Sequence, residues 1–400
     1  MNENPHVLRA CPCCGGFQHT PVHDNRMAPI GGIDMSYRVA ECGICGLLHA
    51  DMLPPSNIYT HYYQTLSKYD QIASIAGISP VDVQRADTTI ALCALHLGKD
   101  EGIADLGCGV GYLLHRFREA GWRNVHGIDP APSAQERARS LFGLEGVCHG
   151  LLTDARERLP LQQTGIVCLT GVLEHLWAPL DDLRLLFASL RPGTRVLIEV
   201  PALERFERPP YEPFGEFSLE HIQYFSARSL ENLMRAAGAE PLSIQLLDLD
   251  ASVTDSLLGL FKVSSEPARA TFPAPAAAES ASIRAYLEGS SHLIDAALGV
   301  LAGTPGPWIV YGAGSHTARL LPMLADQNLD QRIMAIVDGN ANLHGQMMGR
   351  WKVAAPSLLE AHPDATVVIS SFRSQSAIHL LLSKRYPNPL RRLYLAPEAP

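Results

Sequence analysis

The chain has 400 residues, of which 46% are hydrophobic, and its formal net charge is −9 at pH 7. This length exceeds what one hydrophobic core accommodates, so we expect two or three domains. The negative charge argues against a general affinity for nucleic acid, and no apolar run is long enough to cross a bilayer. The first residues lack the pattern of a signal peptide, so we expect a cytoplasmic protein without membrane partners.

Two Cys-x-x-Cys pairs stand near the N-terminus, Cys11 with Cys14 and Cys42 with Cys45, and a glycine follows each pair. Two such pairs can offer four thiolates to one ion, which predicts a structural zinc site. A redox-active motif or free thiols are the alternatives, and Cys13 could replace a neighbouring ligand. The nine cysteines form an odd total, which argues against a disulfide scaffold. We therefore interpret residues 1–55 as a small zinc-binding module.

Residues 54–80 are rich in aromatic side chains and include Tyr62 and Tyr63. They could pack against the next domain, because aromatic clusters more often pack than react. They could equally form a lid whose hydroxyl groups point at a polar substrate. Both readings stay open for this connector.

A glycine-rich turn follows a helical pattern over residues 81–97. The apolar run 103–106 contains Asp105 and leads into Gly107, Gly109 and Gly111, after which a helix begins. Such a turn lets a ligand approach the backbone and the free N–H groups of the helix start. Asp129 ends the next expected strand, where a carboxylate can accept hydrogen bonds from ribose hydroxyls or can cap a helix.

Strands and helices then alternate, which predicts an α/β fold with a parallel sheet covered on both faces. We expect further strands at 146–148, 166–170 and 195–200, and helices at 180–190 and 226–238.

Four motifs in this region resemble those of class I S-adenosylmethionine-dependent methyltransferases. They are Asp-Leu-Gly-Cys-Gly-Val-Gly at 105–111, Gly-Ile-Asp-Pro at 127–130, Val-Leu-Glu-His-Leu at 172–176 and Leu-Arg-Pro-Gly at 190–193. The resemblance implies a seven-stranded Rossmann-like domain that binds S-adenosylmethionine. It also implies that Gly107, Gly109 and Gly111 border the methionine part of the cofactor. Asp105 would help to hold that part, Asp129 would bind the ribose and Asp154 would lie near the adenine.

The long aromatic loop after the fifth strand ends in Glu220, His221 and Tyr224. In open α/β sheets, ligands bind beyond the carboxyl ends of the strands, and this loop belongs at that end. His221 could act as a catalytic base or could simply anchor the loop.

A Pro- and Ala-rich linker at 264–278 precedes an expected helix at 280–301. The strand–turn–helix pattern then repeats, with Gly312, Gly314 and Asp338 in places where a nucleotide could bind. This second, smaller Rossmann-like domain could hold a ligand, or it could only brace the first domain.

The complete arrangement resembles the family of nucleotide-sugar C-methyltransferases, with domains at 1–55, 56–263 and 304–400 and a linker with a helix at 264–303. The family resemblance implies methylation at carbon of a nucleotide-linked ketosugar that lies between the two Rossmann-like domains. His221 would then be the base, and Glu220 would orient it or bind a sugar hydroxyl. Tyr62, Tyr63 or Tyr224 would donate a hydrogen bond to the enolate. An O- or N-methyltransferase for another small metabolite and a non-catalytic cofactor-binding scaffold are the competing hypotheses.

Overall fold

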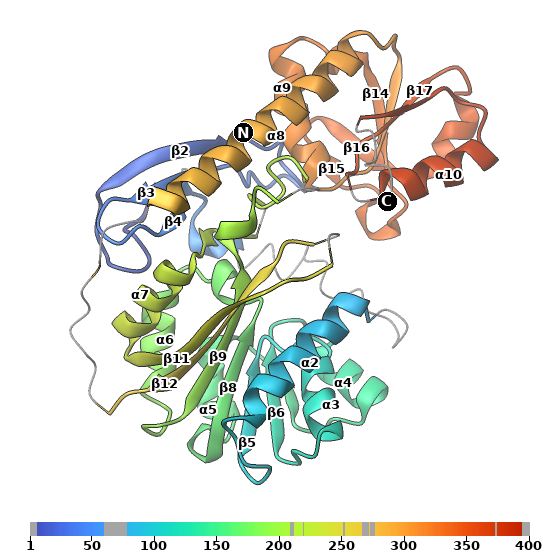
Figure 1. Cartoon of the computed structure of the whole chain (residues 1–400). Coiled ribbons are helices and arrows are strands. Elements are labelled where there is room, and N and C mark those ends of the chain that lie inside the picture. The colour runs from blue at the N-terminus through green and yellow to red at the C-terminus, as the bar shows by residue number, and fades with distance from the viewer. Residues whose placement is uncertain are drawn as a thin grey trace.

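The computed structural model describes residues 6–59, 78–208, 212–218, 220–250, 253–265, 272, 277–372 and 374–393. It has three parts, and the N-terminal sheet lies between a central and a C-terminal α/β domain (Figure 1). The predicted fold class is therefore confirmed, although the central sheet is mixed and not wholly parallel.

The N-terminal module (residues 6–53) is an antiparallel sheet whose strands run in the order β1-β4-β3-β2, with β10 paired to β4. Its elements are β1 (Val7–Leu8), β2 (His19–Asn25), β3 (Tyr37–Cys42), β4 (Leu48–Leu53) and the distant β10 (Gln223–Tyr224). The two cysteine pairs lie in tight turns before β2 and between β3 and β4. Gly15 and Gly46 close these turns with φ angles of 72° and 76°, a region that glycine adopts without steric cost.

The central sheet has the strand order β11-β12-β9-β8-β5-β6-β7. Its strands are β5 (Gly102–Leu106), β6 (Val125–Asp129), β7 (Val147–His149), β8 (Thr164–Thr170), β9 (Arg195–Pro201), β11 (Ala239–Leu247) and β12 (Ser256–Val263). Strands β5 to β9 are parallel, whereas β12 is antiparallel to both β9 and β11. The expected parallel sheet is wrong at this edge, because β11 and β12 follow each other without a crossover helix and so run in opposite directions.

Helices accompany the strands of the central sheet, and α2, α3, α6 and α7 lie where the sequence predicts them. They are α2 (Pro80–Ala94), α3 (Tyr112–Glu119), α4 (Ala134–Phe142), α5 (Ala155–Arg158), α6 (Pro179–Phe187) and α7 (Ala227–Ala237), with short 3-10 turns η3 (Leu152–Asp154), η4 (Leu161–Gln163), η5 (Leu173–His175) and η6 (Leu203–Arg205). Helix α7 has the predicted boundaries: the Ser226 side chain accepts a hydrogen bond from Ser229 N, and Gly238 ends the helix with a φ of 102°.

The C-terminal domain has the strand order β15-β16-β14-β13-β17-β18. Its elements are α8 (Ala277–Ala302), β13 (Trp308–Tyr311), α9 (Ser315–Asp326), η7 (Asp330–Arg332), β14 (Ile333–Val337), η8 (Ala341–Leu343), β15 (Met347–Met348), β16 (Trp351–Ala354), η9 (Pro356–Ala361), β17 (Thr366–Ile369), α10 (Gln375–Arg385) and β18 (Leu390–Arg392). Strands β13, β14, β16, β17 and β18 are parallel, which agrees with the expected Rossmann-like pattern.

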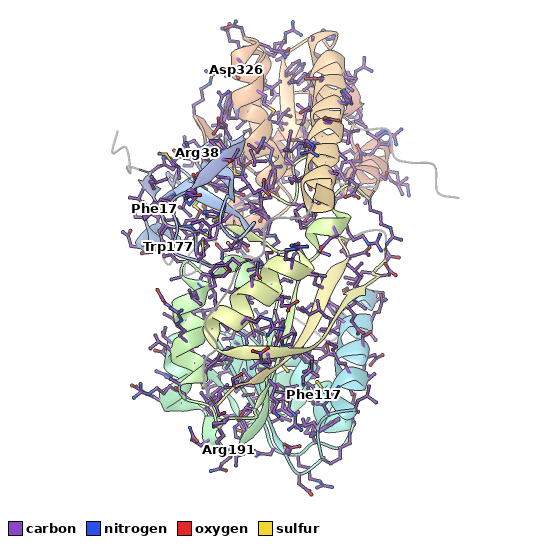
Figure 2. All side chains as sticks on the ribbon, turned by 60° about the vertical axis from the view of Figure 1, so that its left-hand side comes forward. Phe17, Arg38, Phe117, Trp177, Arg191 and Asp326 are labelled. Atoms are coloured by element: carbon purple, nitrogen blue, oxygen red, sulfur yellow. The ribbon has the colours of Figure 1, made fainter. Side chains whose placement is uncertain are left out.

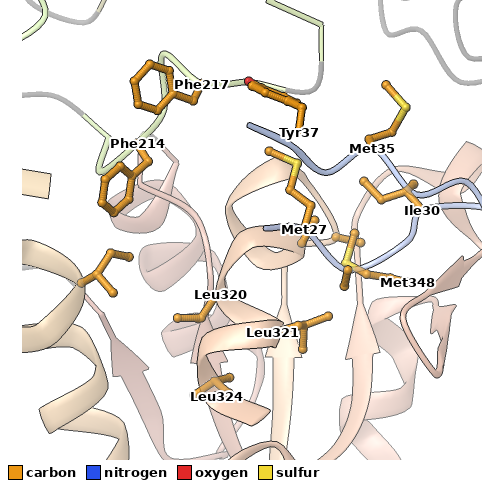
Figure 3. Close-up of a cluster of buried hydrophobic side chains, with 14 of the residues drawn as sticks. Met27, Ile30, Met35, Tyr37, Phe214, Phe217, Leu320, Leu321, Leu324 and Met348 are labelled. Carbon is orange, nitrogen blue, oxygen red and sulfur yellow. The ribbon is translucent and has the colours of Figure 1, made fainter. Parts of the chain in front are cut away.

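One hydrophobic cluster joins the N-terminal module, the loop after β9 and the C-terminal domain. Figure 3 shows side chains from all three regions in this cluster: Met27, Ile30, Met35, Tyr37, Phe214, Phe217, Leu320, Leu321, Leu324 and Met348. The buried Arg319 of α9 adds a polar link, because its guanidinium donates a 2.8 Å hydrogen bond to the carbonyl of Phe217. The loop after β9 is thus fixed between the other parts. Among the described residues, no helix combines the length and apolar character that a membrane crossing requires.

Candidate functional site

A cavity of about 1360 Å³ opens at the carboxyl ends of the parallel strands. Its walls come from the glycine turn after β5, the ends of β6, β8 and β9, the loop that bears His221, and the η8 segment of the C-terminal domain. Ligands of open α/β sheets bind at this end, so the cavity is the candidate active site.

Glycine stands at the three positions of the turn for different physical reasons. Gly107 and Gly111 both have a φ of 82°, and a Cβ atom there would lie 2.6 Å from Val172 Cγ2 and 2.8 Å from Leu144 Cδ1, respectively. Gly109 has a φ of 52°, and a Cβ atom there would meet nothing within 4 Å. Two glycines therefore allow close packing, whereas Gly109 leaves backbone accessible to a ligand in the cavity.

Asp105 lies beneath this turn and is 1% exposed. Within the described part of the chain, its Oδ1 atom has no hydrogen-bond partner. Burial, together with the negative charge of Asp129, raises the pKa of Asp105 to about 7. A buried carboxyl group of this kind, on the wall of the cavity, fits a cationic ligand group such as the α-ammonium of a methionine moiety.

Asp129 and Asp154 also line the cavity. Asp129 accepts hydrogen bonds from Gly109 N at 2.7 Å and from Ala131 N at 2.8 Å, so it braces the glycine turn. Asp154 accepts a 2.9 Å hydrogen bond from Leu151 N. Each carboxylate has further lone pairs, so these backbone contacts are compatible with ligand binding. Their assignment to ribose and adenine stays a prediction.

Two histidines that line the cavity lie close to the buried Glu174. The rings of His175 and His221 lie 4.9 Å apart between centroids, and Glu174 Oε1 lies 3.9 Å from His175 Nε2. Burial raises the pKa of Glu174. The potential ligand atoms of the three side chains all lie within 4.8 Å of one another, so the cluster has the composition of a proton relay and also of a metal site.

The remaining predicted catalytic residues have different positions. Glu220 is 6% exposed and does not line the cavity, and its backbone carbonyl contacts His175 Nδ1 at 3.1 Å. The hydroxyl of Tyr224 donates a 2.8 Å hydrogen bond to the carbonyl of His221. Burial raises the pKa of Tyr224 well above its ordinary value, so this hydroxyl stays a neutral donor. The geometry gives both residues a supporting place beside His221, and neither contacts the cavity. Tyr62 and Tyr63 lie outside the described residues.

Two groups on the cavity wall were not predicted from the sequence. Glu199, near the end of β9, is 5% exposed and pairs with Arg85 Nε of α2 at 2.8 Å. An acid inside the apolar run of β9 was the available signal, because buried acids usually have a functional or structural partner. Asn342 and Gln346 come from the C-terminal domain, and no local pattern indicates that they face the glycine turn.

The second glycine turn is built like the first. Asp338 accepts hydrogen bonds from Ala313 N and Asn340 N, both at 2.7 Å. A Cβ atom at Gly312 would lie 2.6 Å from the carbonyl oxygen of Ser370, so close packing explains this glycine. Gly312, Gly314 and Asp338 do not line the cavity, whereas Asn340 does. A ligand role for the two glycines and Asp338 stays a prediction.

The four cysteines of the two pairs lie together in the N-terminal module. The Sγ atoms of Cys11 and Cys45 are 3.5 Å apart, as are those of Cys14 and Cys42, and all four lie within 4.8 Å of one another. Sulfurs around a tetrahedral zinc ion with Zn–S bonds of ~2.3 Å are separated by about 3.8 Å, so this donor set fits zinc. Cys13 is buried but is not part of the group.

Residues 83–244 match a family described as "Methyltransferase domain". Curated relatives include tRNA U34 carboxymethyltransferases of Vibrio atlanticus, 33% identical over 39% of this chain and 49% of the relative, and of Cellvibrio japonicus, 32% identical over 35% and 45%. That of Klebsiella pneumoniae is 31% identical over 46% and 56%. The chain thus spans about half the length of the curated relatives it matches.

Solved structures that resemble the chain include a 1,6-didemethyltoxoflavin-N1-methyltransferase of Burkholderia thailandensis with bound S-adenosylhomocysteine. It is 21% identical, with a TM-score of 0.36 over 45% of this chain and 78% of that one. Magnesium protoporphyrin IX methyltransferase of Synechocystis is 15% identical, with a TM-score of 0.41 over 52% and 100%.

Proposed function

We propose that the chain is a class I S-adenosylmethionine-dependent methyltransferase and that its acceptor is a nucleotide-linked ketosugar, which it methylates at carbon. The match of residues 83–244 to a methyltransferase-domain family supports the first part of this proposal. The observation that carries the proposal is the composition of the cavity. One wall holds the glycine turn, another holds His175 and His221, and a third comes from η8 of the C-terminal domain. A long, two-part acceptor fits a site that spans two domains, with its sugar beside the histidines and its nucleotide beside η8.

The cofactor supplies an electrophilic methyl group on a sulfonium. Asp105 would hold its ammonium group, Gly109 would let it approach the backbone, and Asp129 would bind its ribose. These contacts would orient the methyl donor toward the acceptor, because transfer requires the acceptor carbon, the methyl group and the leaving sulfur to lie in line.

His221 would remove the proton from the sugar carbon beside the ketone, which leaves an enolate as the nucleophile. His175 Nδ1 faces the carbonyl of Glu220, and an imidazole N–H there would hold the ring with Nε2 on the side of Glu174. His175 could thus share the proton that His221 removes. The buried Glu174 would stabilise the imidazolium that forms.

The relatives' names raise a second acceptor class, since they refer to uridine 34 of tRNA. Their similarity covers less than half of this chain, and the net charge of −9 does not favour binding to a polyanion. A small acceptor modified at oxygen or nitrogen is the third candidate, since a hydroxyl or amine needs little more than a base.

A thermal-shift screen of nucleotide sugars with S-adenosylhomocysteine present would identify the acceptor. Transfer of a labelled methyl group would then be measured with the selected ketosugar and with total tRNA in parallel. We expect label on a sugar carbon, and loss of transfer in His221→Gln with an S-adenosylhomocysteine Kd within about twofold of the parent. His126→Gln is the matched control, because its imidazole lies in the same domain outside the cavity. Label on tRNA, oxygen or nitrogen would contradict the proposal.

Finally, we infer that the four clustered cysteines bind one structural zinc ion. Four thiolates close the tetrahedral coordination, so the ion would serve folding and would take no part in methyl transfer.

A further inference from the structure

The segment that bears His221 belongs structurally to the N-terminal module. Strand β10 pairs with β4, so Gln223 lies opposite His49 and Tyr224 lies opposite Leu48. Ala50 N donates a 2.9 Å hydrogen bond to the carbonyl of Ile222. Although 169 residues (54–222) lie between the two strands, the end of the candidate catalytic loop is thus an edge strand of the cysteine-bearing sheet.

Arg9 lies between β4 and the segment that bears His221, and it contacts both. Its side chain is almost fully buried, with the whole residue 8% exposed. The guanidinium donates to the carbonyls of Ala50 and Trp177 at 2.7 Å each, to the carbonyl of Ile222 at 2.9 Å and to Gln223 Oε1 at 2.6 Å. It also lies 5.4 Å from the centre of the Trp177 ring. Trp177 lies where the N-terminal module meets the central domain (Figure 2).

Ala50 belongs to β4, but the other three acceptors of Arg9 belong to the two segments that carry the histidine pair. Trp177 follows His175 by two residues, and Ile222 directly follows His221. The same segments are joined directly, because Ile222 N donates to the carbonyl of Glu174 at 2.9 Å. Gln223 Nε2 also donates to the carbonyl of Leu173 at 2.9 Å.

We propose that Arg9 is a positioning residue that holds the His175 and His221 segments together, so that the N-terminal module forms part of the active site. The planar guanidinium suits this role, because its fixed fork reaches acceptors on several sides at once. The module in turn fixes Arg9, since Arg9 N donates to the carbonyl of Asp51 at 2.9 Å and the cysteine turn begins two residues later at Cys11. An effect of Arg9 on the rate of methyl transfer depends on His221 being the base, as proposed above. Its effect on the order of the two segments does not depend on that proposal.

The test compares hydrogen exchange, followed by mass spectrometry, in segments 172–178 and 220–225 of the parent, Arg9→Lys and Arg9→Met. We expect exchange in both segments to be at least tenfold faster in Arg9→Met and intermediate in Arg9→Lys, because lysine cannot reproduce the fork. The S-adenosylhomocysteine Kd should stay within about twofold, because Arg9 does not line the cavity. With the acceptor selected by the screen, kcat should fall while the KM for S-adenosylmethionine stays unchanged.

Arg38→Met is the matched control. Arg38 belongs to the same sheet and pairs with the buried Asp51 at 2.7 Å, but it contacts neither segment. The proposal would be overturned if hydrogen exchange in the two segments were accelerated as much in Arg38→Met as in Arg9→Met. It would also be overturned if exchange in both Arg9 variants stayed within twofold of the parent. If Arg9→Met does not fold, the comparison of exchange in Arg9→Lys with that in Arg38→Met decides whether the proposal holds. Loosened segments together with full transfer by His221→Gln would support the role of Arg9 and refute His221 as the base.

Discussion

We expect the buried carboxyl group of Asp105 to make cofactor binding depend on pH. Its pKa in the free protein is raised to about 7, whereas an ammonium ligand prefers the ionised carboxylate. With a pKa of 7, about one-eleventh of the molecules carry an ionised Asp105 at pH 6 and about ten-elevenths at pH 8. The affinity for S-adenosylhomocysteine should therefore rise about tenfold between these values, and binding at pH 6 should release nearly one proton.

Isothermal titration calorimetry at pH 6, 7 and 8, in buffers with different ionisation enthalpies, measures both quantities. Asp105→Asn keeps the shape of the side chain and removes the titration. We expect its Kd to vary less than twofold with pH and to be about 10- to 100-fold weaker than the parent at pH 8, since a charge-assisted hydrogen bond contributes ~1.5–3 kcal/mol. A parent Kd that is constant from pH 6 to 8 would refute this reasoning.

The raised pKa of Asp105 also predicts how the stability of the ligand-free protein changes with pH. The folded pKa of Asp105 lies above its unfolded value of 3.8, so the folded state holds a proton that the unfolded state has already lost. The free energy of unfolding should therefore fall as pH rises from about 4 through 7, by at most ~4 kcal/mol for this group. Urea denaturation across this range should show a flatter profile for Asp105→Asn.

Three further predictions follow from the packing. Cys42→Ser should abolish zinc binding and lower Tm, whereas Cys13→Ser should keep one zinc per chain, as measured by elemental analysis; equal zinc loss in both would contradict the four-cysteine site. Gly107→Ala should weaken S-adenosylhomocysteine binding at least tenfold and destabilise the fold by ~1–3 kcal/mol, whereas Gly143→Ala, also at positive φ but in open space, should leave binding intact. Leu169→Ala should cost ~2–5 kcal/mol in urea denaturation, against less than ~0.5 kcal/mol for the exposed Leu151→Ala; similar costs would contradict the buried position of Leu169.

The features that could be predicted from the sequence depend on interactions between residues that are close together in the chain. Strand β6 and helix α7 have the predicted positions, because apolar periodicity, a serine cap and a terminal glycine act within a few residues. The four cysteines were identified for the same reason, since a Cys-x-x-Cys turn brings two thiols together whatever the rest of the chain does. The glycine turn likewise follows from backbone conformations that only glycine adopts at low cost.

Only the tertiary structure decided which of the predicted catalytic side chains reach the cavity. Glu220 and His221 are neighbours, but only His221 lines the cavity, while the Tyr224 hydroxyl donates a hydrogen bond to the His221 carbonyl. The pairing of β10 with β4, the position of Arg9 and the approach of η8 all depend on contacts between residues far apart in sequence. Such contacts leave no periodic signal, because their register is set by packing between complete elements. The sequence by itself thus determined the glycine turn and the group of four cysteines, while the fold of the three joined parts determined which side chains meet at the cavity.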